Sequence, residues 1–119
     1  MRVLVVDDSV VCQHALCAVV TATPGFEAVG LASSAREALD LVSLADAQLV
    51  LLDVQMPGMN GIETARRIRR RHPDVTVVLL SADARPSEAD ESLVIEDKRD
   101  VSPRWLADVW QRASARSCH

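Results

Sequence analysis

The chain has 119 residues, of which 49% are hydrophobic and 25% are charged, and its formal net charge is -4. These values are typical of one globular domain, and the negative charge excludes a general electrostatic attraction to nucleic acid. No run approaches the roughly 20 apolar residues that span a membrane, and no signal-peptide pattern opens the chain. We therefore expect one domain over residues 1–119, located in the cytoplasm, without membrane or direct nucleic-acid binding. The cysteines, Cys12, Cys17 and Cys118, lack zinc-site spacing and are interpreted as ordinary reduced thiols.

Short apolar runs alternate along the chain with segments of helical periodicity. The runs cover residues 3–6, 49–52, 75–80 and 93–95, and a further strand is expected at about 26–31. Continuous runs of Val, Ile and Leu are typical of strands that are buried on both faces of a parallel sheet. The alternation of strands and helices predicts an α/β, flavodoxin-like, doubly wound sheet of five strands in the order 2-1-3-4-5.

Helices are expected between the strands. Ser9 can cap the first helix, which ends at Pro24-Gly25, and Ser34 with Glu37 forms an S-x-x-E capping box for the second. A third helix follows the turn-rich loop 55–61, and the last begins near Ser102-Pro103. The residues expected to face the core are Cys12, Leu16, Val19 and Val20; Ala35, Ala38, Leu39 and Val42; Ile62, Ala65 and Ile68; and Leu106, Val109, Trp110 and Ala113.

Four of the apolar runs lead to a residue that can handle phosphate or a divalent cation. Asp7 and Asp8 follow the first run, Asp53 follows the run at 49–52, Ser81 follows the run at 75–80, and Lys98 comes shortly after the last. In an open α/β sheet, ligands bind in the crevice beyond the carboxyl ends of the strands. We therefore expect three carboxylates, a hydroxyl and an ammonium group to converge there.

This set of groups suits phosphoryl transfer. At about 4 Å and an effective dielectric constant of about 20, two like charges repel by roughly 4 kcal/mol, so three carboxylates require a compensating cation. Oxygen ligands favour a hard ion such as Mg²⁺. Asp53 could attack phosphorus to form an aspartyl phosphate. Lys98 could then neutralise charge, while the Ser81 hydroxyl could donate a hydrogen bond to a phosphoryl oxygen.

Several motifs carry a family resemblance. VLVVDDS at residues 3–9, LVLLDVQMPGMNGIE at 49–63, VVLLSAD at 77–83 and the late lysine resemble the receiver domain of bacterial two-component response regulators. The resemblance covers nearly the whole chain. DVSPRWL at residues 100–106 bears a weaker similarity to receivers that precede a helix-turn-helix output domain.

The resemblance implies a phosphoacceptor signalling domain rather than an enzyme, one that assists its own phosphorylation and dephosphorylation. Asp53 would accept the phosphoryl group from a phosphohistidine on a sensor histidine kinase, Ser81 would be the switch hydroxyl and Lys98 would contact the phosphate. A protein-interaction surface for an output domain or effector protein would switch in response, although no output domain is expected in this chain. The groups implied to bind Mg²⁺ are the side chains of Asp7, Asp8 and Asp53 and the backbone carbonyl of Gln55.

The chain departs from the family pattern in three places. The segment between Ser81 and Lys98 is shorter than usual by roughly one helical turn, so we expect a short or irregular fourth helix and mobility at residues 84–92. Ile95 stands where an aromatic residue is usual. Arg99 stands where a proline after a cis bond is usual, so we expect a trans bond and a shifted Lys98. These changes predict a homodimer that is weak or rebuilt at the fourth and fifth helical layers.

Two other functions remain open from the sequence. A degenerate receiver that works as a phosphorylation-independent interaction module would fit Ile95 and the short fourth crossover. A small Mg²⁺-dependent phosphohydrolase is disfavoured because nothing supplies a separate general base or substrate pocket.

Three further features have alternative interpretations. The basic run at residues 66–72 is interpreted as a solvated helix face in preference to a patch for nucleic acid or an acidic partner. Trp105 could be an exposed partner anchor or a half-buried residue. His14 is expected to be solvated, without a role as a phosphate relay.

Overall fold

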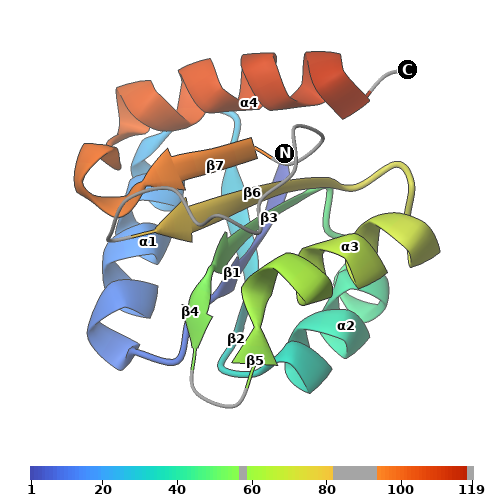
Figure 1. The fold of residues 1–119 in the computed structure, drawn as a ribbon. Coiled ribbons are helices and arrows are strands. Elements are labelled where there is room, and N and C mark those ends of the chain that lie inside the picture. Colours follow the sequence, from blue (N-terminus) through green and yellow to red (C-terminus); the bar gives the residue numbers. More distant parts are fainter. Residues whose placement is uncertain (57–58, 82–93, 118–119) are drawn as a thin grey trace.

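The computed structural model describes residues 1–56, 59–81 and 94–117. Within these ranges, five strands form one parallel sheet in the order β2-β1-β3-β6-β7 (Figure 1). The sheet strands are β1 (Arg2–Val6), β2 (Glu27–Ala32), β3 (Leu49–Asp53), β6 (Thr76–Ser81) and β7 (Val94–Asp97). Because β4 (Gln55–Met56) and β5 (Met59–Asn60) pair separately as an antiparallel ribbon, β6 and β7 are the fourth and fifth strands of the sheet. The predicted order 2-1-3-4-5 is confirmed.

The described helices are α1 (Val10–Ala22), α2 (Ala35–Leu44), α3 (Gly61–Arg71), the short 3-10 helix η1 (Lys98–Asp100) and α4 (Pro103–Ser117). The predicted short or irregular fourth helix, at residues 84–92, lies outside the described residues. The bond between Lys98 and Arg99 is trans, as expected, since no described residue follows a cis peptide bond.

Polar side chains begin α1 and α2. The Ser9 hydroxyl accepts a hydrogen bond from the backbone N–H of Cys12 (3.4 Å), and the Ser34 hydroxyl accepts one from that of Glu37 (3.2 Å). The reciprocal bond of the predicted capping box is displaced by one residue, because the Glu37 carboxylate accepts from the N–H of Ser33 (3.3 Å). These caps satisfy backbone donors that have no partner within a helix.

Alternate residues of the central strands point to opposite faces of the sheet. Leu4 and Val6 of β1 pack with α2 and α3, whereas Val3 and Val5 pack with α1 and α4. Figure 1 shows α1 and α4 on one side of the sheet and α2 and α3 on the other. Burial on both faces explains why the strands are continuously apolar in sequence.

The structure corrects one prediction about the apolar stripes and decides between the two interpretations of Trp105. Gln13 is buried on α1, while Cys12, which was expected to face the core, is only partly buried. Trp105 is only 8% exposed, and its indole N–H donates to the Glu96 carboxylate (3.2 Å). Trp105 is therefore a buried part of the α4 interface rather than an exposed anchor. Ala113, the last predicted core residue, has a side chain outside the described set.

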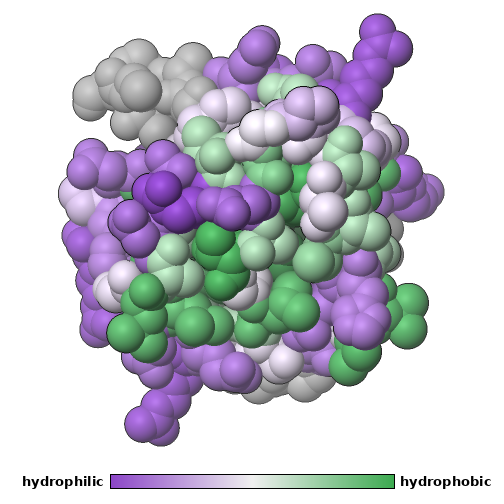
Figure 2. All heavy atoms as spheres, turned by 180° about the vertical axis from the view of Figure 1, so that it is seen from behind, coloured by the Kyte–Doolittle hydropathy of each residue, from purple (hydrophilic) through white to green (hydrophobic). Residues whose placement is uncertain are grey.

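The surface carries exposed apolar and basic side chains. Figure 2 shows apolar residues gathered on the face behind the view of Figure 1. Among the residues whose burial is described, the exposed large hydrophobic side chains are Val10, Val11, Leu31 and Leu44. On α3, Arg67 and Arg70 lie 3.5 Å and 3.7 Å from the Glu63 carboxylate on an exposed face, which agrees with the solvated interpretation of the basic run. None of the described helices is both long and apolar enough to span a bilayer.

Candidate phosphoacceptor and metal site

The predicted site residues lie at the carboxyl ends of the central strands. Asp7 directly follows β1, Asp53 is the last residue of β3, and Ser81 is the last residue of β6. The register pairs Asp53 with Leu80, one residue before Ser81, so β3 and β6 end at nearly the same level. Lys98 follows β7 immediately, as the first residue of η1. The parallel register thus gathers residues that are far apart in the sequence.

Three carboxylates form a compact cluster. One carboxylate oxygen from each of Asp7, Asp8 and Asp53 lies within 4.8 Å of the others. Asp7 is fully buried, Asp53 is 6% exposed and Asp8 is open to solvent. The cluster therefore has a buried inner side and a solvent-facing entrance through which a cation or a phosphodonor could approach.

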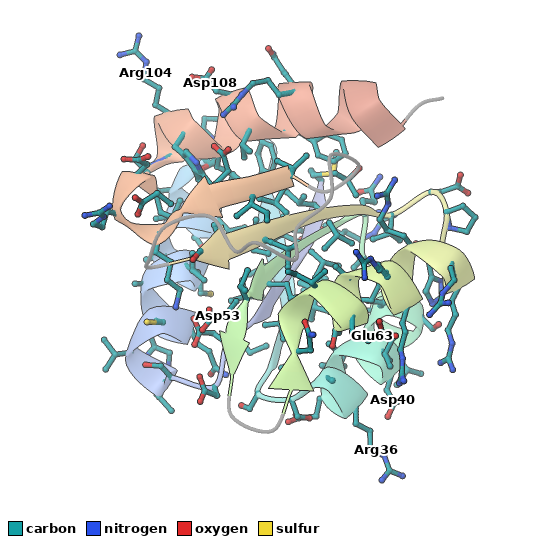
Figure 3. All side chains as sticks on the ribbon, in the orientation of Figure 1. Arg36, Asp40, Asp53, Glu63, Arg104 and Asp108 are labelled. Carbon is teal, nitrogen blue, oxygen red and sulfur yellow. The ribbon has the colours of Figure 1, made fainter. Side chains whose placement is uncertain are left out.

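Figure 3 shows how differently Asp53 and other charged residues lie. Asp53 lies between α1 and β4, whereas Arg36 and Asp40 project outward from α2, and Arg104 and Asp108 project outward from α4. Acidic residues on the helix surfaces are ordinary solvated groups. Asp53, in contrast, is held inside the fold at the end of a fully buried strand.

Lys98 is ion-paired with two members of the cluster. Its ammonium group donates to Asp7 Oδ2 (2.8 Å) and to Asp53 Oδ2 (3.2 Å), and lies 3.7 Å from Cys12 Sγ. Burial acts to lower the pKa of Lys98, but the hydrogen bond to Asp7 and the charges of Asp53 and Asp7 outweigh it and raise this pKa above its ordinary value. Lys98 is consequently a permanent cation at neutral pH. Three carboxylates and one ammonium leave an excess of negative formal charge.

The two neighbouring acids have different surroundings. Both carboxylate oxygens of Asp7 are bonded, since Oδ1 accepts from the backbone N–H of Ser9 (2.9 Å) and Oδ2 accepts from Lys98. Asp8 makes no hydrogen bond or ion pair with any residue that the structure describes, and it is exposed. The carboxylate that is most available to an incoming cation therefore belongs to Asp8, while Asp7 supports the cluster from inside.

The other two predicted residues lie close by in the chain or the sheet. Gln55 begins β4 two residues after Asp53, and it pairs with Asn60 in the short ribbon. Ser81 is 2% exposed at the end of β6. Both therefore lie at the same edge of the sheet as the acidic cluster.

Gly61 is a structural requirement of the site that was treated in the sequence only as a turn residue. A Cβ atom at Gly61 would lie 2.7 Å from Val54 Cα and 2.8 Å from the carbonyl oxygen of Asp53. Any side chain would push the start of α3 away from the backbone that carries Asp53. The signal in the sequence was a glycine at the first position of a helix, directly after the Asn60 cap.

Residues 3–101 match the family model of the response regulator receiver domain. The chain belongs to this family. A receiver domain is a signalling module of two-component systems, and the structural site described above lies within the matched residues.

Two relatives illustrate where such domains occur. The chain is 43% identical over 82 residues to a protein-glutamate methylesterase/protein-glutamine glutaminase of Geobacillus kaustophilus, a match that covers 69% of this chain and 23% of the relative. It is 37% identical over 81 residues to the response regulator GacA of Pseudomonas viridiflava, covering 68% of this chain and 38% of the relative. Each match thus spans well under half the length of the relative.

Solved structures share the fold. The response regulator domain of Thermotoga maritima CheB aligns with a TM-score of 0.78 at 24% identity, over 97% of this chain and 96% of that one. A LuxR-family response regulator from Aurantimonas sp. SI85-9A1 aligns with a TM-score of 0.80 at 25% identity, over 96% of this chain and 84% of that one. Both agree with the flavodoxin-like architecture of the sheet.

Proposed function

We propose that this receiver domain accepts a phosphoryl group on Asp53 in a Mg²⁺-dependent reaction, with a phosphohistidine of a sensor histidine kinase as the donor. The observation that carries the proposal is the meeting of Asp7, Asp8 and Asp53 within 4.8 Å, with Lys98 bonded to two of them. A surface acid that only caps a helix would need neither the buried neighbours nor the lysine. The cluster has the charge and the access that a phosphoacceptor requires.

The donor set fits Mg²⁺. All the candidate ligands are oxygens, and such ions are usually held by one or two carboxylates with water and phosphate oxygens completing the shell. Asp8 and Asp53 would hold the ion with the backbone carbonyl of Gln55, while Asp7 would act from the inner side of the cluster. When bound, Mg²⁺ would supply charge neutralisation for the carboxylates and the phosphoryl oxygens.

The residues of the chain would perform the rest of the transfer. A carboxylate oxygen of Asp53 would attack phosphorus, forming a P–O bond while the P–N bond of the phosphohistidine breaks and its electron pair returns to the imidazole. Lys98, already 3.2 Å from Asp53 Oδ2, would contact a phosphoryl oxygen in the product. The Ser81 hydroxyl would donate a hydrogen bond to another phosphoryl oxygen. Phosphorylation of Asp53 would thus change the contacts of the last residue of β6.

The first turn of α1 offers a surface for the phosphodonor protein. Val10 and Val11 are 61% and 78% exposed, and they follow Asp8 almost directly in the chain. Exposed apolar side chains next to an open carboxylate suit contact with a partner protein.

The reaction would take place in the cytoplasm, and an effector or output domain would bind the surface that phosphorylation changes. We expect any homodimer to be weak or rebuilt relative to that of ordinary receivers.

A second candidate function is a degenerate receiver that acts as an interaction module without phosphate. Ile95 favours it, because this partly buried aliphatic side chain packs against the core beside α2 and α3, at a position where the family pattern has an aromatic residue. Arg99 also favours it, since it pairs with Asp97 (2.6 Å) where the family pattern has a proline. These features concern the surface that would contact an output domain or effector protein rather than the acidic cluster.

The deciding experiment is incubation with Mg²⁺ and acetyl phosphate, followed by intact-protein mass spectrometry. The wild type should gain the mass of one phosphoryl group, and Asp53→Asn should gain nothing. Asp40→Asn, which removes an exposed acid on α2, is the matched control and should gain the same mass as the wild type. No gain in the wild type, with Mg²⁺ present, would favour the phosphate-independent module.

A further inference from the structure

Gln13 is a buried polar residue that has no direct part in the proposed phosphoryl transfer or cation binding. It lies on α1 and is 7% exposed. Its amide nitrogen lies 2.5 Å from the carbonyl oxygen of Asp7, 2.9 Å from Ser33 Oγ and 3.3 Å from the carbonyl oxygen of Ala32. One side chain therefore joins a helix to the ends of two neighbouring strands, at the edge of the sheet that carries the acidic cluster.

The orientation of this amide follows from its partners. The carbonyl oxygens of Asp7 and Ala32 can only accept hydrogen bonds, so the NH₂ group of Gln13 must face them. An apolar side chain of the same length would leave these carbonyls without that donor, and a carboxylate would place oxygen against oxygen. The contact therefore depends on an amide and not simply on a residue of this size.

The bond to the Asp7 carbonyl acts on Asp8 through covalent geometry. The carbonyl of Asp7 belongs to the same planar peptide unit as the nitrogen and Cα of Asp8. A hydrogen bond that fixes the Asp7 carbonyl oxygen therefore fixes the orientation of this peptide plane, and with it the position of the Asp8 Cα atom that carries the side chain. Asp8 needs this support because its own carboxylate has no hydrogen bond or ion pair within the described part of the chain.

Asp7 itself is held at four points. Its N–H donates to the Ala32 carbonyl (3.0 Å), its carboxylate accepts from Ser9 and Lys98, and its carbonyl accepts from Gln13. The first three contacts fix the nitrogen and the side chain of Asp7. The Gln13 bond fixes the peptide that leads to Asp8.

We propose that Gln13 is a positioning residue for the cation site, which holds the Asp7–Asp8 peptide so that the Asp8 carboxylate is placed before a divalent cation arrives. This inference rests on the proposed Mg²⁺-dependent function. Gln13 would thus contribute to the affinity for the cation although its side chain would contact neither the cation nor the phosphate. Partners that orient metal ligands commonly contribute tenfold or more to metal affinity.

The test compares Gln13→Met with Gln48→Met. Gln48 is a matched control because its side chain also binds the backbone of β1, accepting from the N–H of Arg2 (3.0 Å), but at the opposite end of the strand from the site. Affinity for Mn²⁺ is measured by electron paramagnetic resonance, affinity for Mg²⁺ by calorimetry, and stability by thermal unfolding. Gln13→Met should weaken cation binding by on the order of tenfold. Gln48→Met should bind like the wild type, although both variants lose stability.

A second readout separates positioning from general damage. If Gln13 acts through Asp8, saturating Mg²⁺ should restore phosphorylation of Gln13→Met by acetyl phosphate, since only the affinity for the cation is reduced. Equal cation affinity in wild type and folded Gln13→Met would overturn the proposal, as would equal weakening in both variants. If Gln13→Met does not fold, Gln13→Asn, which keeps the amide one methylene too short, is measured with the same expectation.

Failure of the proposed function would give a different result from failure of this inference. A wild type that binds no divalent cation would contradict the Mg²⁺ site itself. A wild type that binds the cation and takes up phosphate, beside a Gln13→Met variant with unchanged affinity, would contradict only the positioning role.

Discussion

Strands β3 and β7 bring candidate site residues to the same cluster of charged side chains from contrasting surroundings. Every residue of β3 is buried in the middle of the sheet, whereas all four residues of β7, at the end of the described sheet, are partly exposed. Asp53 is therefore held in place by packing on two faces. Lys98 follows a strand that is less buried and is held in addition by hydrogen bonds and ion pairs of its side chains.

The bonds around β7 come from its own last residues. The Glu96 carboxylate accepts from Trp105 Nε1 and from Arg112 (3.0 Å), which ties the strand to α4. Asp97 accepts from the backbone and the guanidinium of Arg99, which fixes the start of η1. The position of Asp53 thus depends on the buried core, whereas the position of Lys98 depends more on hydrogen bonds and ion pairs near the surface.

The largest effect is expected from removing the cation. Lys98→Met would leave the carboxylates of Asp7 and Asp53 buried without their ammonium partner, so the free energy of unfolding should fall by about 3 kcal/mol in urea denaturation at neutral pH. Mg²⁺ should recover part of this loss by replacing the missing charge. Arg99→Met, which removes an exposed cation one residue later, should cost far less, because solvent screens its ion pair with Asp97. Equal losses in the two variants would show that the buried carboxylates do not depend on Lys98 for their stability.

A matched pair of valines compares the two strands directly. Val78 of β6 and Val94 of β7 are register partners on the same face of the sheet, but Val78 is fully buried and Val94 only partly. Val78→Ala should lower the free energy of unfolding by about 2.5 kcal/mol through lost burial and a cavity. Val94→Ala should cost about 1 kcal/mol, because its surroundings include solvent. Similar values from chemical denaturation would contradict the contrast.

Gly61 tests the backbone that carries Asp53. Gly61→Ala should destabilise the protein by about 2 kcal/mol, since the new methyl would overlap the backbone of Asp53 and Val54. It should also lower the rate of phosphorylation by acetyl phosphate. Gly25→Ala is the control: its φ of 84° makes alanine strained, yet nothing lies within 4 Å of the added Cβ. Thermal unfolding should show a loss in both variants, whereas slower phosphorylation is expected for Gly61→Ala alone.

The smallest effect concerns acid pH at the β7 end. Hydrogen bonds from the Arg99 side chain and backbone lower the pKa of Asp97 from 3.8 to about 2. Because the pKa of Asp97 is lower in the folded protein, its ionised carboxylate stabilises the fold at pH values above the ordinary pKa. This contribution is lost as the pH falls through the pKa of the folded protein. The difference in stability between wild type and Asp97→Asn should therefore be constant above pH 3.8 and shrink toward pH 2. Urea titrations across this range measure it, and a difference that grows on acidification would refute the assignment.

Much of the fold could be predicted because local rules and the global fold agree. The apolar runs predicted strands within a residue or two, and the caps at Ser9 and Ser34 were found where expected. The gathering of Asp7, Asp8 and Asp53 followed from the rule that parallel strands end at one edge. Their roles in metal and phosphate chemistry remain proposals, and the prediction for residues 84–92 falls outside the described chain.

Other details could not be predicted because they depend on partners distant in sequence. Helical periodicity favoured Cys12 as an inward residue, but Gln13 lies inside because it finds acceptors on β1 and β2. Trp105 was ambiguous because its burial depends on Glu96 of a neighbouring strand. A hydrophobicity pattern assigns a glutamine or a tryptophan the average hydrophobicity of its residue type. In the folded chain, a specific hydrogen-bond partner allows the side chain to be buried.

The parallel sheet and the acids at its edge were predictable from the order of residues, since apolar runs bury on both faces and the carboxyl ends of parallel strands lie at one edge. The bonding of both Asp7 oxygens and the exposure of Asp8 became apparent only in the folded chain. The cause is distance along the chain, because the lysine that engages Asp7 lies 91 residues away. Contacts of that span form only when the sheet has assembled.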